Sequence, residues 1–123
     1  MSFAIVTVLH ESAGDLRTLL DSLALLPERP QLVCVDTGSR DDGAAVAAAW
    51  GAEVVRLEAN PGFGAANNTG LERVSRDVTV LLNPDCVLRD DGLARLAALD
   101  PRGAAGLVRR GLGTYRQSLE RLL

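Results

Sequence analysis

Lysine is absent from this chain, aromatic residues are scarce, and positive charge is never concentrated. All 13 basic residues are arginine, they form no basic run in the sequence, and the formal net charge is −3. Proteins that bind nucleic acid usually present a cluster of positive charge to the phosphates. The sequence therefore predicts no nucleic-acid partner.

Cysteine and histidine are too few to build a metal centre by themselves. The two cysteines, Cys34 and Cys86, match neither the spacing of a zinc motif nor a disulfide framework. We expect one buried and one incidental thiol in a reducing compartment, which predicts a cytoplasmic protein. His10 is the single histidine, so it forms no histidine metal site, and we expect it to be incidental to function.

Long apolar runs are also missing, and the length of the chain is that of one domain. No stretch of about 18 apolar residues occurs, so no transmembrane segment is predicted. The first residues enter a strand-like run without a basic region or cleavage-like site, which predicts no signal peptide. With 123 residues, 47% of them hydrophobic, the chain is long enough for one domain with a core built mainly of Leu, Val and Ala.

Short apolar runs alternate with helix-like segments along the chain. This alternation with short connections predicts right-handed crossovers and a mostly parallel sheet with helices on both faces. Ser12 followed by Asp15 resembles a capping box at the start of the first helix. The expected strands cover residues 3–9, 32–35, 53–57, 78–82 and 104–108, and the expected helices cover 12–26, a short segment ending at Trp50, 65–75, 90–99 and 114–123.

The run 78–82 reads as a strand buried on both faces, and it delivers a carboxylate to its end. Pro84 stops the strand because it has no N–H for the ladder, and Asp85 follows. Ligands of open α/β sheets bind beyond the carboxyl ends of the strands. Asp85 therefore either holds a divalent metal on a nucleotide diphosphate or only caps a turn or faces water. Since only oxygen ligands are available, the metal would be Mg²⁺ or Mn²⁺.

Two other predicted strand ends carry polar residues, and each leaves two interpretations open. Asp36 either caps the turn that follows or accepts hydrogen bonds from a base or a ribose hydroxyl. Segment 60–64 (Asn-Pro-Gly-Phe-Gly) is either a tight loop before a helix or a place where glycines let the backbone approach an anion. Asn67 and Asn68 are poor helix formers near the start of that helix, which favours a functional reason for them.

Three motifs together resemble family 2 glycosyltransferases of the GT-A fold. They are 35–41 (VDTGSRD), 60–70 (NPGFGAANNTG) and 81–85 (LLNPD), in this order. The last is similar to the Asn-Pro-Asp metal motif of the rhamnosyltransferase-like subgroup. The resemblance covers residues 3 to about 108. It implies an α/β, Rossmann-like three-layer sandwich with a mostly parallel sheet, truncated after the metal motif, so that only the N-terminal nucleotide-sugar-binding half is expected.

The resemblance also implies an activity and residue roles. The family transfers a sugar from a nucleotide donor to an acceptor hydroxyl with inversion of the anomeric centre. Thr7 would line the nucleotide pocket, Asp36 would contact the base or ribose, and Asp85 would bind the Mg²⁺ or Mn²⁺ that bridges the diphosphate of a UDP- or dTDP-type donor. The other residues assigned to nucleotide-sugar binding are Gly38, Asn60, Gly62, Phe63, Asn67, Asn68 and Asn83.

No catalytic residue follows from the resemblance. The family's general base is an Asp or Glu of the acceptor half, tens of residues beyond the Asn-Pro-Asp motif, and it has no matched position here. We expect a donor-binding domain over 1–108 and an amphipathic helix over 109–123. Two interpretations stay open. The chain is the donor-binding half of an inverting glycosyltransferase whose acceptor half is missing, or it is a non-catalytic module that binds a partner or a second copy through its last helix.

Overall fold

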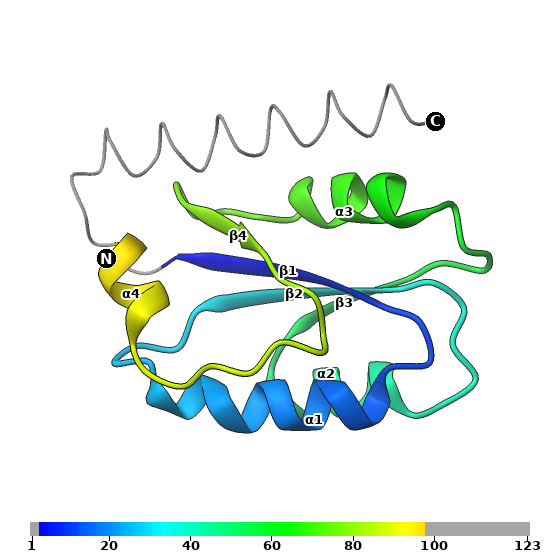
Figure 1. Ribbon diagram of the computed structural model, residues 1–123. Helices are drawn as coiled ribbons and strands as arrows, with labels where there is room; N and C mark the ends of the chain where they lie inside the picture. The colour runs from blue at the N-terminus through cyan, green and yellow to red at the C-terminus, as the bar shows by residue number, and fades with distance from the viewer. Residues whose placement is uncertain (1–2, 98–123) are drawn as a thin grey trace.

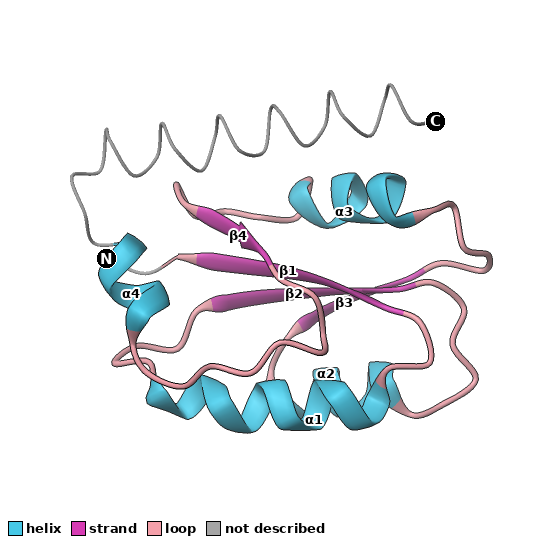
Figure 2. Ribbon diagram, in the orientation of Figure 1, coloured by secondary structure: helices cyan, strands magenta, loops and turns pink. Residues whose placement is uncertain are grey.

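The computed structural model describes residues 3–97 and shows a four-stranded parallel sheet between two layers of helices (Figures 1 and 2). The strand order is β3-β2-β1-β4, with every neighbouring pair parallel. This confirms the predicted α/β class. The strands are β1 (Ala4–Leu9), β2 (Gln31–Asp36), β3 (Glu53–Arg56) and β4 (Thr79–Leu81), and the helices are α1 (Ala13–Ser22), the 3₁₀ turn η1 (Leu23–Leu25), α2 (Gly43–Trp50), α3 (Phe63–Leu71) and α4 (Gly92–Ala97).

β1 lies inside the sheet, and all six of its residues are buried. It pairs with β2 on one edge and with β4 on the other, so its backbone groups are satisfied on both sides. Its side chains alternate between the two faces of the sheet. Ile5 and Leu9 join the larger core cluster, whereas Val8 joins a smaller cluster on the opposite face. The continuous apolar run of β1 follows from this double burial.

Helices cover the two faces unequally. Leu16 and Leu19 of α1 are completely buried in the larger cluster, which α2 joins through Ala47. Among the described helices, α3 lies on the other face (Figure 1), and Ala66 packs there against Val8 and Val35. In the described part of the chain, no helix is both long and apolar enough to cross a membrane.

The predicted elements are all present as far as residue 97, but several details are wrong. α3 begins at Phe63 and ends at Leu71, instead of covering 65–75. It begins early because Gly62, with φ of 99°, turns the chain into the helix, a conformation that favours glycine. The last turn tightens through an i→i+3 bond from the N–H of Arg73 to the carbonyl of Gly70, at 3.0 Å. The strand expected at 104–108 and the helix expected at 114–123 lie outside the described residues.

β4 is not buried on both faces as its sequence suggests. Within residues 3–97 it pairs only with β1, and Val80 and Leu81 are half-buried. The apolar run correctly predicted a strand. It did not show that this strand lies at the edge of the described sheet.

The start of α1 is capped from another loop and not by the predicted capping box. The hydroxyl of Ser12 donates to the carbonyl of His10 at 2.8 Å and makes no cap bond. Instead, Oδ2 of Asp41 accepts a hydrogen bond from the N–H of Ala13 at 3.0 Å. The carboxylate of Asp41 is brought there by the fold, so the local sequence pattern did not reveal it.

We expect Gly70→Ala to destabilise the domain because α3 approaches the sheet closely at this residue. A Cβ there would lie 2.5 Å from Cγ1 of Val6 and 3.1 Å from Cγ2 of Val35. Overpacking of this kind lowers the free energy of unfolding by about 1–3 kcal/mol. Urea denaturation measures it. Gly14→Ala is the matched control, because nothing lies within 4 Å of its Cβ position in α1. It should be neutral or stabilising by up to ~1 kcal/mol. Equal stability of the two variants would contradict the close contact.

Candidate functional site

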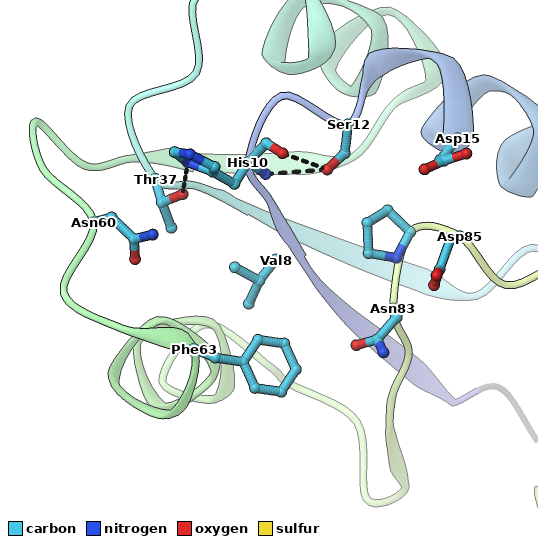
Figure 3. Close-up of a pocket in the computed structure, with 10 residues that line it drawn as sticks. Val8, His10, Ser12, Asp15, Thr37, Asn60, Phe63, Asn83 and Asp85 are labelled. Atoms are coloured by element: carbon cyan, nitrogen blue, oxygen red, sulfur yellow. Dashed lines mark hydrogen bonds between the residues drawn. The ribbon is translucent and has the colours of Figure 1, made fainter. Parts of the chain in front are cut away.

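A cavity of about 350 Å³ lies at the edge of the sheet where β1 and β4 end (Figure 3). Its walls come from four segments that are far apart in the sequence: the end of β1 with the start of α1, the loop after β2, the start of α3, and the loop after β4. The parallel order of the strands brings these segments together at one edge. The lining residues are Val8, His10, Ser12, Asp15, Thr37, Asn60, Phe63, Asn83, Pro84 and Asp85.

A chain of hydrogen bonds holds His10 on one side of the cavity. Nδ1 of His10 lies 3.0 Å from Oγ1 of Thr37, and this hydroxyl donates to the carbonyl of Leu9 at 2.9 Å (Figure 3 draws the first of these bonds). A hydroxyl has one proton, and a carbonyl oxygen can only accept. With the hydroxyl proton of Thr37 on the carbonyl of Leu9, Nδ1 of His10 is the donor in its bond to Thr37.

The β3–α3 loop forms a second wall. Oδ1 of Asn60 accepts a hydrogen bond from the N–H of Gly62 at 2.9 Å, which is a side-chain-stabilised turn. α3 starts directly after it and presents Phe63, whose side chain is 46% exposed, to the cavity. The cavity thus gains an aromatic surface beside an amide, and the loop glycine allows the tight turn between them.

Carboxylates line another part of the cavity. Asp15, in the first turn of α1, and Asp85, after β4, are both exposed, as is Asn83. In Figure 3 the two carboxylates lie on one side of the cavity, and His10 and Thr37 lie on the other. Exposed carboxylate and amide oxygens are ligands that suit Mg²⁺ or Mn²⁺. Within residues 3–97, no group of three or more His, Cys, Asp or Glu side chains could hold a metal. The donor set therefore fits a metal that completes its shell with ligand phosphates and water.

Four residues singled out from the sequence meet at this cavity. Asn60, Phe63, Asn83 and Asp85 come from two separate motifs, and all of them line it. Gly62, Asn67 and Asn68 do not line it, but they belong to the loop and the helix that carry Asn60 and Phe63. Asn67 is buried, and its Nδ2 donates to the carbonyl of Phe63 at 3.0 Å, which supports the first turn of α3.

Thr7, Asp36 and Gly38 do not line the cavity. Thr7 is completely buried, and strand alternation places its side chain on the α1 face with Ile5 and Leu9, while its neighbour Val8 reaches the cavity. Oγ1 of Thr7 is the one buried side-chain oxygen or nitrogen within the described part that has no partner. Thr7 and Val8 thus lie on opposite faces of β1, and a role of Thr7 in nucleotide binding stays a prediction.

Asp36 is buried, and its Oδ1 accepts a hydrogen bond from the N–H of Ser39 at 3.3 Å. This bond agrees with the simpler interpretation, in which Asp36 caps the turn after β2. Gly38 has φ of 85° in that turn, and a Cβ would lie 3.1 Å from the carbonyl oxygen of Glu58. Both residues therefore shape the loop that carries Thr37, and their contact with a nucleotide stays a prediction.

Sequence reasoning missed half of the cavity. Val8, Ser12, Asp15 and Thr37 were not predicted to be site residues, and His10 was expected to be incidental. His10, Ser12 and Thr37 closely follow the end of a strand, so the rule that ligands bind at strand ends could have identified them. His10 was weighed only as a metal ligand, although a single imidazole can bind a ligand by hydrogen bonding or stacking.

The two cysteines differ in environment as expected. Cys34 lies in β2, and burial raises the pKa of its thiol to about 12, so it stays protonated and unreactive. Cys86 is half-buried beside Asp85 and does not line the cavity. Neither residue carries the chemistry of the site.

Comparison with known proteins gives a consistent family. The sequence model of glycosyl transferase family 2 matches residues 4–111. Uncharacterised glycosyltransferases of Mycobacterium tuberculosis and Mycobacterium bovis are 32% identical to the chain over 99 residues, which is 80% of this chain and 45% of each relative. The chain thus spans less than half the length of the curated relatives that it matches.

Solved structures show the same fold. The crystal structure of S. aureus TarS 1–349 in complex with UDP-GlcNAc has a TM-score of 0.72 at 24% identity and covers 80% of this chain and 30% of that chain. The mannosyltransferase PcManGT from Pyrobaculum calidifontis, in complex with GDP-Man and Mn²⁺, has a TM-score of 0.72 at 19% identity, with coverage of 80% and 32%. These likenesses confirm the GT-A fold. The family-model match over residues 4–111 and the relatives at 32% identity show that the chain belongs to glycosyltransferase family 2.

Proposed function

We propose that this chain binds a nucleotide-diphosphate sugar of the UDP or dTDP type, together with a divalent metal, as the donor site of an inverting glycosyltransferase. The observation that carries the proposal is the meeting of Asp85 and Asn83, from the end of β4, with Asn60 and Phe63 in one cavity at the carboxyl edge of the sheet. Motifs separated in sequence contribute complementary groups to a single site, which favours binding over a purely structural role.

The cavity offers separate surfaces to the parts of such a donor. Asp85, with Asn83 and Asp15 beside it on the cavity wall, would hold Mg²⁺ or Mn²⁺ at the diphosphate. The amino end of α3 also lies at the cavity, and the positive end of the helix dipole favours negative charge there. The bound metal would offset negative charge that develops on the departing nucleotide diphosphate.

The remaining wall suits a base, a ribose or a sugar. Phe63 presents an exposed ring, Val8 adds an apolar surface, and His10 and Thr37 add a hydrogen-bonding edge that is already fixed in place. The structural neighbours are complexes with UDP-GlcNAc, UDP and GDP-Man, so uridine and guanosine nucleotides are the natural comparison in binding experiments.

Transfer also needs a carboxylate that takes the proton of the acceptor hydroxyl. We assign this role to no residue between positions 3 and 97. Because the chain covers 45% of the curated relatives' length, the proposal places the base and the acceptor site in the part of those relatives that has no counterpart here. Donor binding and turnover are therefore separate properties, and the first is testable without the second.

We expect UDP or dTDP to bind more tightly with Mn²⁺ than without it, and Asp85→Asn to remove that gain. Loss of one charged metal contact should weaken binding at least about tenfold, which corresponds to ~1.4 kcal/mol. Calorimetric titration measures both affinities. Asp77→Asn is the control, since Asp77 is an equally exposed carboxylate away from the cavity. If the folded wild type binds none of UDP, dTDP and GDP, the donor-site proposal is wrong. If Asp85→Asn keeps the metal dependence, Asp85 is not the ligand.

We expect Phe63→Ala to weaken nucleotide-sugar binding roughly fivefold or more, because stacking on an aromatic ring contributes ~1–3 kcal/mol. Its side chain is 46% exposed, so the free energy of unfolding should change little. Leu25→Ala is a suitable control, because Leu25 is 49% exposed and does not line the cavity. Titration calorimetry and thermal unfolding of both variants separate the two effects. Equal affinities for the donor in the two variants would contradict a role of Phe63 in the site.

A further inference from the structure

Glu11 has an unusual backbone conformation at the edge of the donor site. Its φ is 50°, and it is the only non-glycine residue between positions 3 and 97 with a positive φ. Side chains other than glycine rarely adopt this conformation, and they keep it only where the surroundings hold them. Glu11 stands between His10 and Ser12, which both line the cavity, although Glu11 itself does not.

Two hydrogen bonds fix Glu11 in this conformation. Its N–H donates to Oγ of Ser39 at 2.9 Å, and its Oε1 accepts a hydrogen bond from the N–H of Arg40 at 2.6 Å. Both partners belong to the loop after β2, the same loop that carries Thr37. The backbone and the carboxylate of Glu11 are therefore attached to one neighbouring loop, and the direction of the chain on either side of Glu11 is set by that attachment.

His10 depends on this attachment for its place in the cavity. Its ring is exposed, and the one hydrogen bond of the ring within the described part joins Nδ1 to the hydroxyl of Thr37. On one side of His10, the carbonyl of Leu9 accepts hydrogen bonds from the N–H and the hydroxyl of Thr37. On the other side, Glu11 attaches the chain to the same loop through Ser39 and Arg40.

We infer that Glu11 is a positioning residue of the donor site, whose carboxylate holds His10 in a fixed orientation for contact with the nucleotide. This inference rests on the proposed donor-binding function. A side chain held in its binding orientation before the ligand arrives avoids the entropy cost of ordering it on binding. Removing the carboxylate should therefore weaken nucleotide binding without any lost contact between Glu11 and the ligand.

The elements on either side of Glu11 are held in place by hydrogen bonds that do not involve it. The start of α1 is held by the bond from Ala13 to Asp41, and the end of β1 is held by the bond from the N–H of Thr37 to the carbonyl of Leu9 at 3.0 Å. Neither bond involves Glu11. Loss of its carboxylate should thus loosen residues 10–12 while the sheet and the helices stay in place.

The test compares Glu11→Ala with Glu11→Gln. Alanine and glutamine experience the same backbone strain at this position, but glutamine keeps an oxygen that accepts the Arg40 N–H. We expect Glu11→Ala to weaken UDP or dTDP binding in the presence of Mn²⁺ about three- to tenfold. Glu11→Gln should stay within about twofold of the wild type. Glu28→Ala is the control, because Glu28 is exposed and lies away from the cavity.

The single histidine provides a second readout that does not need a ligand. Imidazole ¹⁵N shifts distinguish the two neutral tautomers, and with one histidine the signals belong to His10. The wild type and Glu11→Gln should show Nδ1–H, whereas Glu11→Ala and Thr37→Val should shift toward Nε2–H. Urea denaturation of every variant checks that the fold is retained.

Each outcome separates this inference from the proposed function. If the wild type binds no nucleotide, the proposed function fails, and the ¹⁵N spectra still decide whether Glu11 positions His10. If nucleotides bind but Glu11→Ala matches the wild type, or if Glu11→Gln loses as much affinity as Glu11→Ala, the positioning role is wrong. A wild-type His10 with the Nε2–H tautomer would overturn it as well.

Discussion

The structure depends on the burial of β1 between two sheet partners and two layers of helices. A strand enclosed in this way tolerates few polar groups, since each buried polar atom without a partner costs ~1–3 kcal/mol. Thr7 is the exception, with a hydroxyl that has no partner. The polar residues needed for binding must then follow the ends of the strands. Because all strands are parallel, these ends meet at one edge, and a single cavity collects them.

The cavity is built asymmetrically. On the His10 side, the β1–α1 and β2–α2 loops are joined by the hydrogen bonds that His10 and Glu11 make with Thr37, Ser39 and Arg40. Asp85, in contrast, is exposed and forms no hydrogen bond or ion pair with other residues of the described part. One side of the site is thus fixed before any ligand binds. In the proposed donor site, a metal and a diphosphate would set the orientation of Asp85, as expected for an ion that takes most of its ligands from substrate and water.

The sequence predicted the types and order of the elements well, because the spacing of apolar residues in a segment indicates both its secondary structure and its buried face. It failed where the deciding contact comes from elsewhere in the chain. Ser12 looked like the cap of α1, but Asp41 supplies that bond. Val8 lines the cavity and Thr7 does not, because the two side chains lie on opposite faces of β1, and an apolar strand does not show which face meets the site.

The site shows the same limit. Asn60, Phe63, Asn83 and Asp85 were found through motifs with characteristic residues, since the loop chemistry of Asn-Pro-Gly and Asn-Pro-Asp is local. His10 and Thr37 are joined by a hydrogen bond although they are 27 positions apart, and no local sequence pattern predicts such a pair. Glu11 is harder still, because a glutamate at positive φ runs against the preference of its own residue type.

Packing and binding are linked through α3. This helix touches the sheet most closely at Gly70, and Phe63, at its other end, lines the cavity. A helix is nearly rigid along its length, and seven residues span about 10 Å. A shift of a few tenths of an ångström at Gly70 therefore tilts the helix and moves Phe63 relative to Asn83 and Asp85. The absence of a side chain at position 70 is thus part of the geometry of the cavity, although Gly70 itself does not line it.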